Sequence, residues 1–87
     1  PVLVDCYADC CGPCKMMAPT IEELAEEYEG RVRIGKLDVD SEGGVAERYG
    51  IQSIPTLLFI KGGEVVDQTV GVLSRDKIQD KLDALLK

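Results

Sequence analysis

The sequence has no histidine and no tryptophan, and it contains a single phenylalanine among 87 residues. Without histidine, the chain can form neither a cysteine–histidine nucleophile nor a zinc site that combines cysteine with histidine. It has no apolar run near the ~20 residues that a membrane span needs, and its first residues do not resemble a signal peptide. Any catalytic chemistry must therefore come from sulfur, carboxylates, lysines and the backbone.

Acidic residues outnumber basic ones by 16 to 10, which leaves a net charge of −6. Such a chain repels nucleic acid and anionic membrane surfaces, so we expect neither of these as a partner. The length fits one small globular domain over residues 1–87, with enough buried surface for a modest core. We expect this domain to be a monomer.

All four cysteines fall between positions 6 and 14. The disulfides of a small secreted protein would be spread along the chain, because they stabilise most when they close long loops. Clustered cysteines instead favour redox chemistry in a reducing compartment, and we expect a cytoplasmic location.

The apolar pattern along the chain predicts alternating strands and helices. The apolar run at 1–7 is typical of a strand covered on both faces. An apolar stripe of Met17, Ile21, Leu24 and Tyr28 predicts a helix over 12–29, which Pro19 should kink. The remaining elements expected are a strand at 31–39, a helix at 42–49 capped by Asp40 or Ser41, strands at 55–60 and 64–70 joined by the turn Gly62-Gly63, and a last helix capped by Ser74.

This order, β-α-β-α-β-β-α, predicts an α/β fold. A right-handed crossover makes the first two strands parallel, and the Gly62-Gly63 hairpin makes the last two antiparallel. We expect a four-stranded mixed sheet flanked by helices on both faces.

Cys11-Gly12-Pro13-Cys14 places two sulfurs one turn apart at the start of the first helix. Side chains at i and i+3 share a helix face and lie close enough for a disulfide. Unpaired N–H groups and the helix dipole favour a thiolate at the helix start, so Cys11 is predicted to be the attacking nucleophile. Cys14 is predicted to resolve the mixed disulfide, while Pro13 stiffens the turn between the two thiols.

Further segments accompany this motif: Val2–Asp5, Lys36–Asp40, Tyr49–Ile51, Ile54–Leu57, Gly63–Val66 and Gly71. Together they span nearly the whole chain, and the combination resembles the thioredoxin family. The resemblance implies the minimal thioredoxin-like fold and a thiol–disulfide oxidoreductase that reduces disulfide-containing protein substrates. It also implies electrons from a flavoprotein thioredoxin reductase or an equivalent donor, and no cofactor or metal beyond the Cys11/Cys14 pair.

The resemblance assigns roles to residues outside the motif. Asp5 resembles the family's buried proton acceptor for Cys14, Lys36 its charge partner, and Ile54-Pro55 the cis-proline loop against the sulfurs. From the residues alone, a carboxylate in an apolar strand should have a raised pKa, which suits proton transfer; the alternative is a structural Asp5–Lys36 ion pair. The substrate surface implied around Cys11 consists of Cys10, Val39, Ile54, Val70, Gly71 and Val72.

The chain departs from the family in two places. The usual first strand and helix have no counterpart in this sequence, so the strand at 31–39 is expected at the sheet edge. The family's tryptophan before the nucleophile is replaced by Cys10. Cys10 can be a small apolar residue or a third redox thiol that protects Cys11 or resolves a mixed disulfide. Cys6 is expected to be buried and inert.

Three alternatives remain open. The nearest is a glutaredoxin-like reductase fed by glutathione, or a reductase dedicated to one partner enzyme. A metal or iron–sulfur module would use all four cysteines, but one strand end and one helical turn are poorly placed to enclose an ion. A structural subunit without redox chemistry would lose nothing on the substitution Cys11→Ser.

Overall fold

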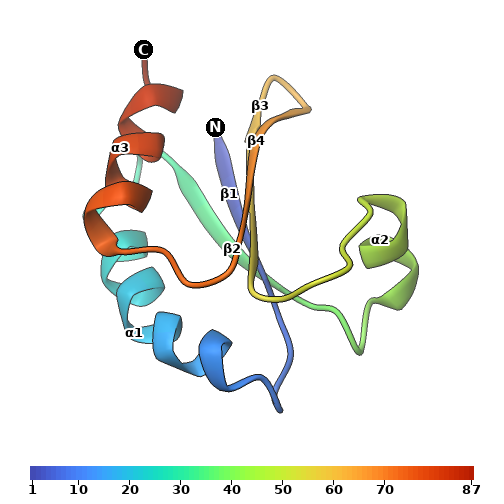
Figure 1. Cartoon of the computed structure of the whole chain (residues 1–87). Helices are drawn as coiled ribbons and strands as arrows, with labels where there is room; N and C mark the ends of the chain where they lie inside the picture. The colour runs from blue at the N-terminus through green and yellow to red at the C-terminus, as the bar shows by residue number, and fades with distance from the viewer.

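The computed structural model describes residues 1–87 and has the predicted element order β-α-β-α-β-β-α (Figure 1). No helix in it is long and apolar enough to cross a membrane. The elements are β1 (Val2–Tyr7), α1 (Gly12–Glu27), β2 (Arg33–Asp38), α2 (Gly43–Arg48), β3 (Thr56–Lys61), β4 (Glu64–Val70) and α3 (Arg75–Leu85).

The four strands form one mixed sheet in the order β2-β1-β3-β4. Strand β1 is central: it pairs in parallel with β2 and antiparallel with β3, and β3 pairs antiparallel with β4. Helices α1 and α3 lie on one side of the sheet, and α2 lies on the other (Figure 1). The predicted α/β fold with a four-stranded mixed sheet is confirmed, and β2 is an edge strand as expected.

The core lies between the sheet and the pair α1 and α3. The predicted stripe of α1 is buried, and α3 adds Ile78, Leu82 and Leu85 to the same cluster. Leu3 and Phe59 are directly opposed on β1 and β3, so they present one sheet face to these helices. Burying each such side chain stabilises the fold by about 1.5–3 kcal/mol.

Helix α1 begins at Gly12 as predicted but ends at Glu27, two residues earlier than expected. Tyr28 leaves helical geometry (φ −99°, ψ 10°), and Gly30 takes φ +84°, a value that glycine tolerates without strain. The helix continues through Pro19. The predicted cap of α3 is confirmed, because Ser74 Oγ accepts a hydrogen bond from the Lys77 amide at 3.3 Å.

The expected cap of α2 is wrong. Its N-cap is Glu42, without a side-chain hydrogen bond, and neither Asp40 nor Ser41 caps the helix. The Asp38 carboxylate instead accepts hydrogen bonds from the amides of Asp40 and Ser41, at 2.9 and 3.4 Å. In this Asx-type turn, Asp40 and Ser41 bond to the last residue of β2 and do not cap α2.

Helices α1 and α3 are also joined by polar contacts that the sequence does not indicate. Tyr28 donates its hydroxyl hydrogen to Asp83 Oδ1 at 2.6 Å. Arg75 bonds both Glu23 and Glu27 of α1. Tyr28 is 1% exposed and Asp83 is exposed, so this hydrogen bond is partly buried. The exposed ion pairs of Arg75 contribute only about 0–1 kcal/mol each.

Candidate active site

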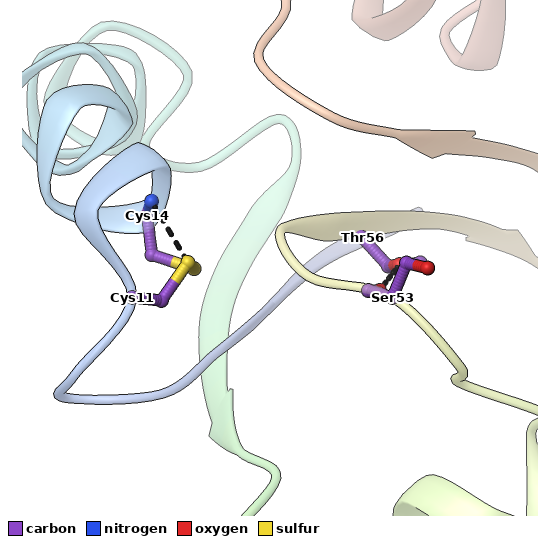
Figure 2. Close-up of a disulfide and its surroundings, with 4 residues drawn as sticks. All are labelled: Cys11, Cys14, Ser53 and Thr56. Carbon is purple, nitrogen blue, oxygen red and sulfur yellow. Dashed lines mark hydrogen bonds between the residues drawn. A yellow bond between two sulfur atoms is a disulfide. The ribbon is translucent and has the colours of Figure 1, made fainter.

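A disulfide joins Cys11 and Cys14 at the start of α1 (Figure 2). Their Cα atoms are 5.2 Å apart, within the range that a disulfide bridges without displacing the backbone. Gly12 and Pro13, between them, are exposed, and the proline occupies the first turn, where its missing N–H costs no hydrogen bond. The pair therefore stands on a rigid helix end that is open to a partner.

The two sulfurs of the pair differ in exposure and in hydrogen bonding. Cys11 is the N-cap of α1, and its Sγ accepts a hydrogen bond from the Cys14 amide at 3.2 Å. Cys11 is partly exposed, whereas Cys14 is 5% exposed. An N-terminal amide aimed at the first sulfur favours its thiolate once the disulfide is reduced. Cys11 is thus the accessible and electrostatically favoured sulfur.

Asp5 is a buried carboxyl on β1. It is 3% exposed, and its Oδ1 has no hydrogen-bond partner. Burial raises the pKa of Asp5, because the charged form loses its hydration, and the positive charge of Lys36 lowers it in part. Leu3, two residues earlier on the strand, belongs to the core beneath α1, so Asp5 faces the same side.

Lys36 stands beside Asp5 in the β1–β2 register, but its ion pair is with Glu22 of α1. The Lys36 Nζ to Glu22 Oε1 distance is 3.8 Å, and both side chains are well exposed. The Lys36 Nζ also lies 5.9 Å from the centre of the Tyr7 ring. Lys36 therefore acts on Asp5 through its electrostatic field, while its direct ionic contact is with Glu22.

The Ile54–Pro55 peptide bond is cis. Pro55 is buried, and its carbonyl accepts a hydrogen bond from the Gly71 amide at 2.8 Å. The turn before β3 is closed by a bond from the Thr56 hydroxyl to the Ser53 carbonyl, and Figure 2 draws this turn in the surroundings of the disulfide. Gly71 has φ +92°, so only glycine holds this contact without strain.

The residues expected to form the substrate surface are all at least partly accessible. Val70 is 60% exposed and Val72 is 51% exposed. Val39, Ile54 and Gly71 are half-buried, and Cys10 is exposed. The two surface hollows of the chain, about 560 and 400 Å³, are lined by none of these residues.

The other two cysteines are free and lie in opposite environments. Cys6 is 0% exposed, and burial, with a smaller contribution from Asp5, raises its pKa to about 11. Cys10 is exposed. No group of three or more histidine, cysteine, aspartate or glutamate side chains is arranged to hold a metal ion.

Two contacts near the site were not predicted from the sequence. The Glu22 contact with Lys36 joins a helix to a strand, and Met17 accepts a hydrogen bond from the Leu73 amide at 3.4 Å. The apolar pattern identified Met17 only as a member of the apolar stripe, and it assigned no role to Glu22. Nothing in the local sequence distinguishes either residue from its neighbours.

A dithiol at a helix N-terminus, with a partly exposed first sulfur and a buried second one, defines a site for thiol–disulfide exchange. The thioredoxin family model matches residues 1–84 of the chain. A thioredoxin from Chlorobaculum thiosulfatiphilum is 56% identical over 82 residues, which cover 94% of this chain and 76% of that protein. Thioredoxin 1 from Nostoc sp. is 46% identical over 83 residues, which cover 95% and 78%.

Among solved structures, a mutant thioredoxin from Halobacterium salinarum superposes with a TM-score of 0.92 at 38% identity, covering 99% of this chain and 74% of that one. The chain belongs to the thioredoxin family. It is a thiol–disulfide oxidoreductase whose redox-active pair is Cys11 and Cys14.

Proposed function

We propose that the protein reduces exposed disulfides of other proteins, with Cys11 as the nucleophile, Cys14 as the resolving thiol and Asp5 as the proton acceptor. The observation that carries this assignment is the unequal exposure of the two sulfurs at the N-terminus of α1, where only Cys11 is accessible to a large substrate. Gly12 and Pro13 hold the two sulfurs at bonding distance.

In the first step, the Cys11 thiolate attacks one sulfur of the substrate disulfide. A bond forms between Cys11 Sγ and that sulfur, the substrate S–S bond breaks, and the other substrate sulfur leaves as a thiolate and takes up a proton. The Cys14 amide, which points at Cys11 Sγ, stabilises the attacking thiolate before the step.

In the second step, the Cys14 thiol loses its proton and attacks Cys11 Sγ. The Cys11–Cys14 disulfide forms, and the mixed disulfide breaks to release the reduced substrate, so two electrons pass from the dithiol to the substrate. Asp5 is suited to accept the Cys14 proton, because burial raises its pKa above the usual value and leaves Oδ1 without a competing hydrogen-bond partner. Lys36 limits that rise through its charge.

The substrate is an extended segment that docks on Cys10, Val39, Ile54, Val70, Gly71 and Val72. Exposed valines beside the cis-Pro55 turn offer apolar contact, and the accessible surface there suits a macromolecule better than a small ligand. The Cys11–Cys14 disulfide of the oxidised protein is reduced again by thioredoxin reductase or an equivalent electron donor, which is the general arrangement in this family. A reductase fed by glutathione, or one dedicated to a single partner, is the alternative.

The remaining assignments concern the setting of the reaction. We infer a single domain over residues 1–87 that works as a monomer in the cytoplasm, without metal, nucleic acid or membrane. The support is the clustering of all four cysteines around one reactive pair, which suits a reducing compartment.

The test is insulin reduction, followed with NADPH and thioredoxin reductase in one assay and with glutathione and its reductase in another. We expect turnover in the first assay only. Cys14→Ser should accumulate a mixed disulfide on Cys11, whereas Cys11→Ser should accumulate none and be inactive. Turnover only with glutathione would establish the alternative donor, and turnover with neither donor would contradict the proposed activity.

A further inference from the structure

Three segments carry the proposed site: the first turn of α1, the cis-Pro55 turn and the turn Gly71–Leu73 that leads from β4 to α3. The last of these belongs to no regular element, yet it carries Gly71 and Val72 of the proposed docking surface. Its position relative to the dithiol must therefore be held by specific contacts. The Gly71 amide donates a hydrogen bond to the Pro55 carbonyl at 2.8 Å, which attaches one end of the turn to the cis-Pro55 turn directly before β3.

The other end of the turn is attached to α1 by sulfur. The Leu73 amide donates a hydrogen bond to Met17 Sδ at 3.4 Å, across 56 positions of sequence. Met17 is 2% exposed and belongs to the core cluster, against which Leu73 also packs. A thioether is a weak acceptor, but here it is the partner that the structure provides for this amide.

Met17 lies one helical turn beyond Cys14, on the same face of α1. The hydrogen bond from Leu73 thus links the docking turn to the helix that carries the dithiol. With the Gly71 contact, it ties all three segments of the site to one another. Loss of the sulfur would leave the Leu73 amide without an acceptor at a half-buried position and free that end of the turn.

We propose that Met17 is a positioning residue for substrate binding, whose sulfur holds the turn Gly71–Leu73 against α1 and so sets the place of Val72 relative to Cys11. This role rests on the proposed docking surface. It predicts that Met17 affects the affinity for protein substrates and leaves the reactivity of Cys11 itself unchanged, because the hydrogen bond of Met17 is with the Leu73 amide, whereas Cys11 Sγ accepts its hydrogen bond from the Cys14 amide.

The chain offers a matched control, because its two methionines are adjacent and only one is buried. Met16 is 73% exposed, whereas Met17 is 2% exposed. The pair are the only methionines in the sequence. In a Met16→Leu protein, Met17 is the one methionine of the sequence that remains. Biosynthetic replacement of methionine by norleucine then substitutes a methylene group of similar size for the Met17 sulfur.

The experiment compares this norleucine protein with the Met16→Leu protein that retains Met17, and Met17→Leu serves as a second variant. Amide exchange by NMR should be about tenfold faster at Leu73 and unchanged at Ile21 in the core of α1. The KM for insulin should rise about threefold, while the rate of Cys11 alkylation by iodoacetamide stays the same. Met16→Leu alone should change none of these values.

Unchanged exchange at Leu73 would overturn the proposed contact, and faster exchange without a change in KM would overturn its role in binding. A fall in the Cys11 alkylation rate would assign Met17 to the dithiol rather than to docking, and so would also overturn the proposal. Failure of the parent protein to reduce insulin at all would instead count against the proposed function, since exchange at Leu73 is measured without any substrate.

Discussion

The end of β1 and the start of α1 each carry a cysteine, five residues apart, and the two regions treat sulfur in opposite ways. Cys6 lies in the strand, fully buried beside Asp5, and its pKa is raised to about 11. Cys11 begins the helix, partly exposed, with the Cys14 amide pointed at its sulfur. A strand interior offers burial and a negative neighbour, whereas a helix N-terminus offers unpaired N–H groups. Reactivity therefore follows from position in the fold and not from residue type.

The largest difference between the two regions should appear in thiol alkylation of the reduced protein. With a pKa of about 11, Cys6 is a thiolate in only about one molecule in 10⁴ at pH 7, and it is also shielded from reagents. Peptide mapping after iodoacetamide treatment should find Cys11 labelled at least ~10³-fold faster than Cys6. Denatured protein is the control, and there all cysteines should react alike. Rapid labelling of Cys6 in the folded protein would contradict the expected difference in reactivity between Cys6 and Cys11.

Asp5→Asn tests whether the strand region serves the reaction at the helix. The variant keeps the shape of the side chain but cannot accept the Cys14 proton, so the second step should slow by about 10²-fold. Stopped-flow kinetics should show the first attack by Cys11 nearly unchanged and the mixed disulfide accumulating. Asp9→Asn, at an exposed carboxyl beside the motif, is the matched control. Equal rates of the second step in the variant and the parent would show that Asp5 has only a structural role.

Cys10→Trp tests how the exposed residue before Cys11 affects substrate binding. An indole there would add a large flat apolar surface next to Cys11, and an aromatic side chain of the substrate packed on it would contribute about 0.5–1.5 kcal/mol beyond the buried area. The KM for insulin should fall about threefold to tenfold, with little change in kcat. Cys10→Ser distinguishes the two interpretations of this residue: unchanged kinetics in that variant indicate a small packing residue, and slower recovery from oxidation indicates a third redox thiol.

The smallest effect expected is on stability, and its sign follows from the raised pKa of Asp5. Below pH 3.8, the pKa of Asp5 in the unfolded chain, the carboxyl is protonated in both the folded and the unfolded state. Its burial then does not lower the free energy of unfolding through charge. As the pH rises through the raised folded pKa, the native state must bury a charge, so the parent protein loses stability relative to Asp5→Asn. Urea unfolding should show the variant more stable at pH 8 and the two proteins converging toward pH 4. A gain independent of pH would point to packing instead of charge.

Much of this architecture was predictable because its causes are local. The alternation and stripe patterns predicted every strand and helix in order, with errors confined to the ends of elements. The cap of α2 was predicted wrongly because Asp40, Ser41 and Asp38 all have side chains that can bond nearby amides, and only the folded turn shows which one does. The Lys36–Glu22 and Met17–Leu73 contacts left no local signal at all.

The sequence by itself determined the element order and the reactive pair, because a CxxC motif at a helix start places two sulfurs one turn apart whatever surrounds it. Only the tertiary structure decided which contacts surround that pair: the contact of Lys36 with Glu22, and the attachment of the Gly71–Leu73 turn to Pro55 and Met17. These contacts join residues that are distant along the chain. They exist only when the register of the sheet and the packing of α1 bring those residues within a few ångströms of each other.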